Sequence, residues 1–136
     1  MINIRNILIV KIILSAFLIA ISGSKPVSAQ SYNIKNDTFW NTKNGKPIYS
    51  QGGGIFKFTD PGTGKEKYYW YGVHYKQAEA YREDPLVTQR GNGFEGVTCY
   101  TSTDLVNWKF EANVLTKEEV GGHGWMWLGR TGVAYV

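Results

Sequence analysis

The 136-residue sequence has few of the residues that form cross-links or hold metals. Cys99 is the only cysteine, so an internal disulfide is excluded, and its place mid-strand among apolar neighbours predicts a buried structural thiol. The two histidines, His74 and His123, show no ligand spacing with Cys99, and the acidic residues form no calcium-loop pattern. Phosphate-binding and dinucleotide-binding glycine motifs are also absent. We therefore predict no metal and no cofactor.

Long apolar runs are scarce too, and the one that exists lies near the N-terminus. A positive region with Arg5 and Lys11 precedes an almost continuous apolar run over residues 12–21, and a small-residue cleavage pattern ends at Ala29. Ten residues are too few to span a bilayer as a helix. We predict that residues 1–29 are a secretory signal peptide and that the protein is secreted or periplasmic, without stable membrane insertion after cleavage. An uncleaved membrane anchor is the alternative.

Residues 30–136, the predicted mature domain, have little excess charge of either sign. Three of the 15 basic residues lie in the leader, so twelve remain against all 11 acidic residues, and the formal net charge falls from +4 to +1. A nucleic-acid interface needs basic residues clustered on one face. We therefore expect no nucleic-acid partner.

Aromatic residues and glycine are abundant in the mature domain. It holds all five tryptophans, all nine tyrosines, five of six phenylalanines and 15 of 16 glycines, and it has no long helical periodicity. This composition predicts an all-β fold. The aromatic residues and glycines fit core packing and turns. They also fit a sugar-binding surface, where rings pack on the C–H faces of pyranoses and glycine lets backbone approach a ligand.

The mature domain contains four candidate strands in meander order, namely residues 55–58, 67–73, 94–101 and 108–114. A turn rich in glycine and proline, residues 60–64, separates the first two. The 20-residue connection from His74 to Gly93 is long for such a sheet. We expect residues 76–82 to form two helical turns that stop at Asp84-Pro85, and we leave open whether this connection binds a ligand or is a plain insertion.

The segment from Phe94 to Phe110, FEGVTCYTSTDLVNWKF, is the most specific part of the sequence. Strict alternation would place Phe94 with Gly96, Thr98 and Tyr100 on one face, and Glu95 with Val97, Cys99 and Thr101 on the other. A polar corner follows, in which Ser102, Thr103, Asp104 and Asn107 can accept backbone N–H bonds above an apolar Trp108. The segment predicts two strands joined by a tight reversal.

Two features follow the fourth strand. The sequence Thr116-Lys117-Glu118-Glu119 has capping-box form, but Gly121-Gly122 limits it to a single helical turn. The run GWMWLGRTGVAYV, residues 124–136, then predicts a new β segment.

Three motifs, SQGGGIFKF (50–58), KYYWYGV (67–73) and TSTDLVNW (101–108), together resemble the first blade of the five-bladed propeller glycosidases of glycoside hydrolase family 43. The sequence is most similar to the branch of exo-β-1,3-galactanases and their Bacteroidetes relatives. The resemblance covers about residues 37–136. It implies the first blade and the start of the second blade of a β-propeller, a polysaccharide or oligosaccharide as partner, and C-terminal blades beyond this chain.

The catalytic residues of that family do not carry over to this sequence. Glycoside hydrolysis generally needs two carboxyl groups. The family's aspartate position falls on Gly52, and glutamates of the galactanase-like branch fall on Val73 and Gly129; the general acid belongs to a later blade. The catalytic residues are therefore unknown, and the fragment is expected to be inactive alone.

Five residues remain as candidate substrate-binding positions. Gln51 could hydrogen-bond sugar hydroxyls, Gly52 and Gly53 would let backbone line the channel, His74 follows the second strand, and Arg130 offers a planar fork for a carboxylate. Each also has an ordinary structural interpretation. We predict an exported glycosidase acting on polysaccharide side chains. A non-catalytic glycan-binding propeller and a small β-sandwich binding module are the alternatives.

Overall fold

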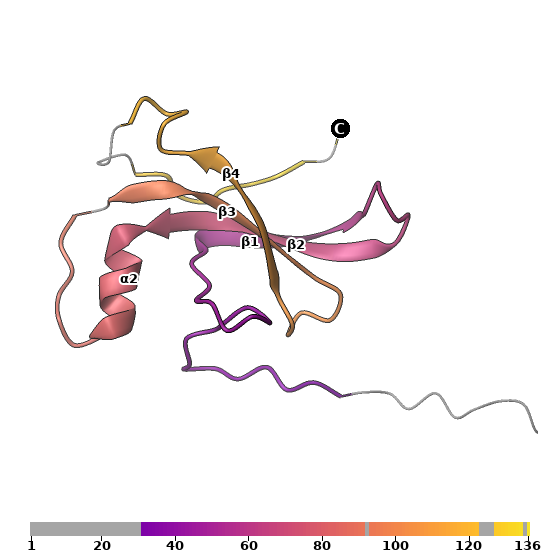
Figure 1. The fold of residues 1–136 in the computed structure, drawn as a ribbon, viewed down its shortest axis with the longest axis horizontal. Helices are drawn as coiled ribbons and strands as arrows, with labels where there is room; N and C mark the ends of the chain where they lie inside the picture. Colours follow the sequence, from indigo (N-terminus) through magenta and orange to yellow (C-terminus); the bar gives the residue numbers. More distant parts are fainter. Residues whose placement is uncertain (1–30, 92, 123–126, 135) are drawn as a thin grey trace, which may run out of the picture. The chain divides into compact units, whose positions relative to one another are not determined.

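The computed structural model describes residues 31–91, 93–122, 127–134 and 136. The predicted signal peptide and His123 lie outside these residues. Chain contacts separate Met1–Ser31 from Tyr32–Val136, and every element below belongs to the second unit. These elements, labelled in Figure 1, are β1 (Gln51–Thr59), β2 (Glu66–Tyr75), α2 (Lys76–Glu83), β3 (Phe94–Ser102) and β4 (Lys109–Thr116).

The four strands form one antiparallel sheet in the order β1-β2-β3-β4 (Figure 1). This confirms the all-β class and the predicted meander. A β-sandwich requires two packed sheets, whereas the described residues form one. The expected pairing of the second and third strands is confirmed, with Trp70 opposite Tyr100 and Val73 opposite Val97.

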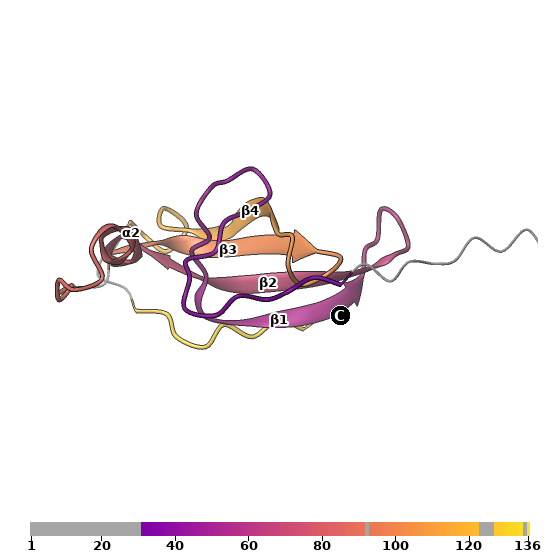
Figure 2. The same ribbon diagram turned by 90° about the horizontal axis from the view of Figure 1, so that it is seen from below.

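Both faces of the sheet carry large apolar side chains, because another segment of the chain covers each face. On one face, the Trp70 ring contacts those of Trp40 and Trp108 at centroid distances of 5.8 and 5.2 Å. The opposite face holds the core cluster of Val73, Tyr75, Phe94 and Val97, with Leu115, Val120 and Leu128 packed against it. Figure 2 shows residues 32–50 over one face and residues 127–134 along the other.

Strict alternation is wrong for Phe94. Tyr75 pairs with Phe94 while His74 pairs with Gly96, so Glu95 is an extra residue in a β-bulge. An inserted residue reverses the side to which the following or preceding residues point. Phe94 therefore joins Val97 in the core cluster instead of lying with Thr98.

The polar corner between β3 and β4 forms as expected, with Asp104 at its centre. Asp104 Oδ1 accepts backbone N–H bonds from Val106 at 3.0 Å and Asn107 at 2.7 Å, and its Oδ2 accepts a hydrogen bond from the Asn107 side-chain Nδ2 at 2.8 Å. Trp108 packs beneath with 1% of its surface exposed, and its Nε1 donates to the Leu105 carbonyl at 3.1 Å. The corner thus satisfies its own backbone and buries one large ring.

The helix and the two other turns also match the sequence. Asp84 ends α2 by donating its N–H to the Ala80 carbonyl at 3.0 Å. In the first hairpin, Asp60 accepts the Thr63 N–H at 2.8 Å. After β4, the Glu119 carboxylate accepts the Thr116 N–H at 2.7 Å while Thr116 Oγ1 accepts the Glu119 N–H at 3.3 Å, which are the reciprocal bonds of a capping box.

Besides Phe94, two further sequence expectations differ from the structure. The first strand begins at Gln51 rather than residue 55, because a register shift lets Gln51 pair with Val73 despite the glycines between. The β segment expected over residues 124–136 is not formed in its described part: residues 127–134 pair with no strand. Arg130, at φ 56°, interrupts the extended conformation there. None of the helices among the described residues is long and apolar enough to cross a membrane.

Candidate functional site

A cleft of about 720 Å³ opens where β1 begins, β2 ends and the long β2–β3 connection starts. Every described residue that lines it is uncharged. Its rings are Phe39, Tyr49, Tyr75, Tyr81 and Trp127; its polar residues are Ser50, Gln51, Gln77, Thr88 and Gln89; and its remaining lining residues are aliphatic side chains, proline and glycine from the same segments. The cleft combines exposed ring faces with amides that can both donate and accept hydrogen bonds.

Helix α2 forms one wall of the cleft, and Arg82 attaches this helix to the segment before β1. The guanidinium donates to the Trp40 carbonyl at 3.2 Å and to Asn41 Oδ1 at 2.6 Å, and it lies 5.1 Å from the centre of the Phe39 ring. Phe39 in turn meets Tyr81 edge to face at 5.9 Å. These contacts place two rings from distant parts of the sequence at the same opening.

Trp127 also lines the cleft, and its position depends on Tyr75. The Tyr75 hydroxyl donates to the Leu128 carbonyl at 2.7 Å and accepts the Leu128 N–H at 2.9 Å. Trp127 itself remains 73% exposed. A large ring held in the open beside a cleft is available to a ligand, because its own chain does not bury it.

Gln51 is the only candidate binding residue that lines this cleft. It is exposed at the first position of β1. The Gly53 backbone lies so close to β2 that a Cβ atom on it would overlap the Tyr71 carbonyl oxygen. Gly52 has φ +62°, and a Cβ atom there would lie 3.7 Å from the Arg130 backbone nitrogen. The two glycines therefore act through backbone geometry, since they set the bulge that presents Gln51.

His74 and Arg130 do not join Gln51 in the cleft. The His74 ring stacks on Tyr49 with centroids 4.6 Å apart and planes 3° apart. Its Nε2 is 2.9 Å from Glu79 Oε1, at ion-pair distance but outside hydrogen-bond geometry. His74 lines a second pocket instead of the cleft. Arg130 is exposed and forms no ion pair with a described residue.

The carboxyl groups with shifted pKa values serve structural contacts elsewhere. Hydrogen bonds from Lys67 and Thr63 hold the pKa of Asp60 well below its usual range. Burial raises the pKa of Glu111, but hydrogen bonds from Thr101 and Lys109 outweigh it, and the net shift is downward. A general acid needs a raised pKa. These two carboxyls have the opposite shift, and neither lines the cleft.

The described residues contain no cluster of three or more histidine, cysteine or acidic side chains suited to a metal ion. Cys99 is buried, as the sequence predicted. Burial raises the pKa of its thiol and outweighs the hydrogen bond with Tyr71. Such a group is a poor nucleophile, because the thiolate is the reactive form.

Sequence reasoning missed most of the cleft. Phe39, Tyr81 and Trp127 lie at sequence separations of more than 40 residues, and no local pattern joins them. The one available signal was the unusual length of the connection after β2, which supplies Gln77, Tyr81 and Gln89.

No family model and no curated protein matches this chain. Among solved structures, an exo-β-1,3-galactanase from Clostridium thermocellum matches with 34% sequence identity and a TM-score of 0.44. The match covers 62% of this chain and 14% of that one, so the chain spans about one seventh of that enzyme's length. That enzyme belongs to the class of proteins that the three sequence motifs resemble.

Proposed function

We propose that this chain is the first blade, with the start of the second, of an exported propeller glycosidase of the family 43 type. The cleft at the start of β1 would form part of its glycan site. The observation that carries the proposal is the pairing of exposed Trp127 and Tyr81 rings with the Gln51 amide in one uncharged cleft. Rings of this kind pack on the apolar faces of pyranoses, and amides bind hydroxyl groups as donor and acceptor.

The uncharged lining favours a neutral polysaccharide side chain as the ligand of this cleft. A carboxylate-bearing sugar would lose its hydration there without gaining a cation, and burying an unpaired charge is costly. Neutral hydroxyl groups can instead exchange hydrogen bonds with Gln51, Gln77 and Gln89.

In this proposal the chain contributes binding and orientation rather than the acid and base. Hydrolysis requires two carboxyl groups at the scissile bond, and none lines the described cleft. The chain alone is therefore expected to be inactive, with the reacting groups supplied by further blades. A non-catalytic glycan-binding propeller is the second candidate, and the same absence of lining carboxyls favours it.

The test uses the protein in its intact, exported form. Gln51→Ala should lower turnover on its glycan by about 10- to 1000-fold, because substrate or water loses orientation, without loss of folding. Full activity in this variant would remove Gln51 from the site. Binding without measurable hydrolysis across galactans, arabinans and xylans would reject the enzyme and support the non-catalytic alternative.

A matched pair of tyrosines tests the aromatic wall separately. Tyr81 and Tyr32 are 48% and 43% exposed, but only Tyr81 lines the cleft. Tyr81→Ala should weaken binding of neutral oligosaccharide about tenfold, as loss of a ring contact does, whereas Tyr32→Ala should leave it unchanged. Equal effects of the two substitutions in calorimetric titration would contradict the assignment of this cleft.

A further inference from the structure

A second pocket, of about 600 Å³, lies on the tryptophan-bearing face of the sheet. Its lining differs from that of the cleft in charge: it includes Lys43, Lys46 and Lys109 together with the His74 ring, and no described carboxyl group lines it. Asn44 and Asn113 add amides at its edge. A concave surface lined by cations and amides, without carboxylates, attracts anions.

Two of the lysines stand on a turn whose backbone is held from both sides. The Thr42 N–H donates to the Lys46 carbonyl at 2.8 Å, and the Gly45 N–H donates to the Thr42 carbonyl at 2.9 Å. The Lys43 N–H donates to the Trp108 carbonyl at 2.9 Å, which joins the turn to the start of β4. The buried Trp108 thus anchors the segment that carries the lysines, and less ordering is needed when they bind a ligand.

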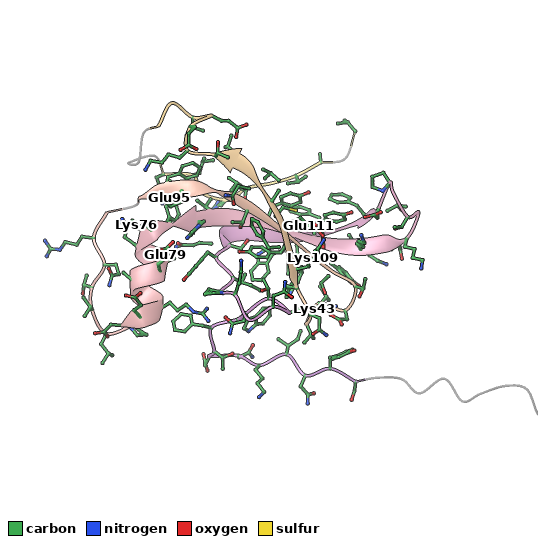
Figure 3. The ribbon with its side chains drawn as sticks, in the orientation of Figure 1. Lys43, Lys76, Glu79, Glu95, Lys109 and Glu111 are labelled. Atoms are coloured by element: carbon green, nitrogen blue, oxygen red, sulfur yellow. The ribbon has the colours of Figure 1, made fainter. Side chains whose placement is uncertain are left out.

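Lys43 and Lys46 are also the cations without a partner here. The third lysine of the lining, Lys109, has its Nζ 2.9 Å from Glu111 Oε2. Neither Lys43 nor Lys46 forms an ion pair with a described residue. Figure 3 shows Lys43 near Lys109. Glu111 lies beside Lys109 on β4, and Glu79 lies apart from them on α2. The two turn lysines therefore supply the positive charge that remains available.

Two features favour an anionic sugar over other anions. Phe110, 45% exposed, offers a ring face beside the lysines. Tyr49 lines both this pocket and the cleft, so a single glycan chain could extend from one to the other. A nucleic acid would need a longer basic face than two unpaired lysines provide.

We propose that this pocket binds the carboxylate or sulfate group of an acidic sugar, with Lys43 and Lys46 as its ligands. The inference goes beyond the neutral cleft, and its saccharide identity rests on the proposed function. The complete ligand is a glycan with a neutral portion in the cleft and an acidic residue over the turn. Cleft and pocket would then recognise different sugars of one branched or mixed polysaccharide.

The test compares retention of the intact protein in native gels containing polygalacturonate or neutral galactan. Lys43→Gln/Lys46→Gln should weaken retention by polygalacturonate about tenfold and leave retention by galactan unchanged. Lys35→Gln/Lys65→Gln makes the same charge change at exposed positions outside the pocket and should change neither retention by more than about twofold. The turn is held by backbone and Thr42 atoms, so these lysine substitutions leave its bonds in place.

Each other outcome has a distinct meaning. Equal losses of polygalacturonate retention in the pocket variant and in the Lys35→Gln/Lys65→Gln control would show diffuse charge attraction and would overturn the site. Retention by duplex DNA as strong as by polygalacturonate, or competition by inorganic sulfate as effective as by galacturonate oligosaccharides, would overturn the acidic sugar as ligand. If galactan does not retain the protein but retention by polygalacturonate still depends on Lys43 and Lys46, the proposed neutral cleft is rejected and the anion site stands.

Discussion

The Tyr75 hydroxyl exchanges two hydrogen bonds with the backbone of Leu128, donating to its carbonyl at 2.7 Å and accepting its N–H at 2.9 Å. The ring of the same tyrosine belongs to the core cluster at the end of β2. One side chain therefore ties the sheet to the segment that carries Trp127. The position of this cleft wall depends on a contact between residues 53 positions apart.

Removing this hydroxyl should loosen the Trp127 wall while leaving the sheet intact. Tyr75→Phe leaves the Leu128 N–H and carbonyl without their partner, at a cost of about 1–2 kcal/mol. Hydrogen exchange at the Leu128 amide should become faster. Tyr81→Phe is the control, because the Tyr81 hydroxyl makes no hydrogen bond to a described residue. Unchanged Leu128 exchange in Tyr75→Phe would show that other contacts hold the segment.

Trp108 should be the most costly aromatic truncation in β4 and its corner. It is 1% exposed and contacts Trp70 at 5.2 Å, so Trp108→Ala should lower the free energy of unfolding by about 3–5 kcal/mol. Phe110 lies two positions later and is 45% exposed, so Phe110→Ala should lower the free energy of unfolding much less. Denaturant unfolding of both variants measures the difference. A Trp108→Ala change within about 0.5 kcal/mol of wild type would contradict the packing described for the corner.

Asp104 should make the protein sensitive to acid. Burial would raise the pKa of its carboxyl, but hydrogen bonds from Asn107, Val106 and Ser102 outweigh burial and hold the pKa well below its usual range. The folded state thus binds the proton less tightly than the unfolded chain does. The resulting stability is present above the unfolded aspartate pKa of about 3.9 and is lost as the pH falls toward the folded value.

The corresponding variant is Asp104→Asn. It should lose about 1–3 kcal/mol of unfolding free energy at neutral pH and show a weaker decline of stability below about pH 4. Asp37→Asn serves as control, since Asp37 is exposed and its φ of 55° suits asparagine. Chemical denaturation at several pH values gives both quantities. An Asp104→Asn stability that declines with acid as steeply as wild type would assign the sensitivity to other carboxyls.

Gly53 should tolerate no side chain, because a Cβ atom would overlap the Tyr71 carbonyl oxygen across the β1–β2 pair. Gly53→Ala must separate the strands at the bulge and should cost about 1–3 kcal/mol. Gly132→Ala adds the same methyl group where no atom lies within 4 Å, and its effect should be small. Melting temperatures of the two variants would distinguish a close backbone approach at Gly53 from a general cost of replacing glycine.

Much of the local structure follows directly from the sequence. The corner at Asp104, the helix stop at Asp84 and the capping box at Thr116 each depend on bonds between residues less than five positions apart. Such bonds form wherever the side-chain oxygens occur at the right spacing. The meander order also follows, because strands that are consecutive in the sequence usually lie side by side in a sheet, and short turns join β1 to β2 and β3 to β4.

The face on which Phe94 lies and the composition of the two pockets were decided by tertiary structure. The bulge at Glu95 moved Phe94 into the core, where burial of its ring outweighs regular pairing. Gln51 and His74, both candidate binding residues in the sequence, line different cavities, although Gln51 pairs with Val73, the residue before His74. Rings and amides from residues 39, 51, 81 and 127 meet only through long-range contacts, and no local pattern in a sequence records which distant segments pack together.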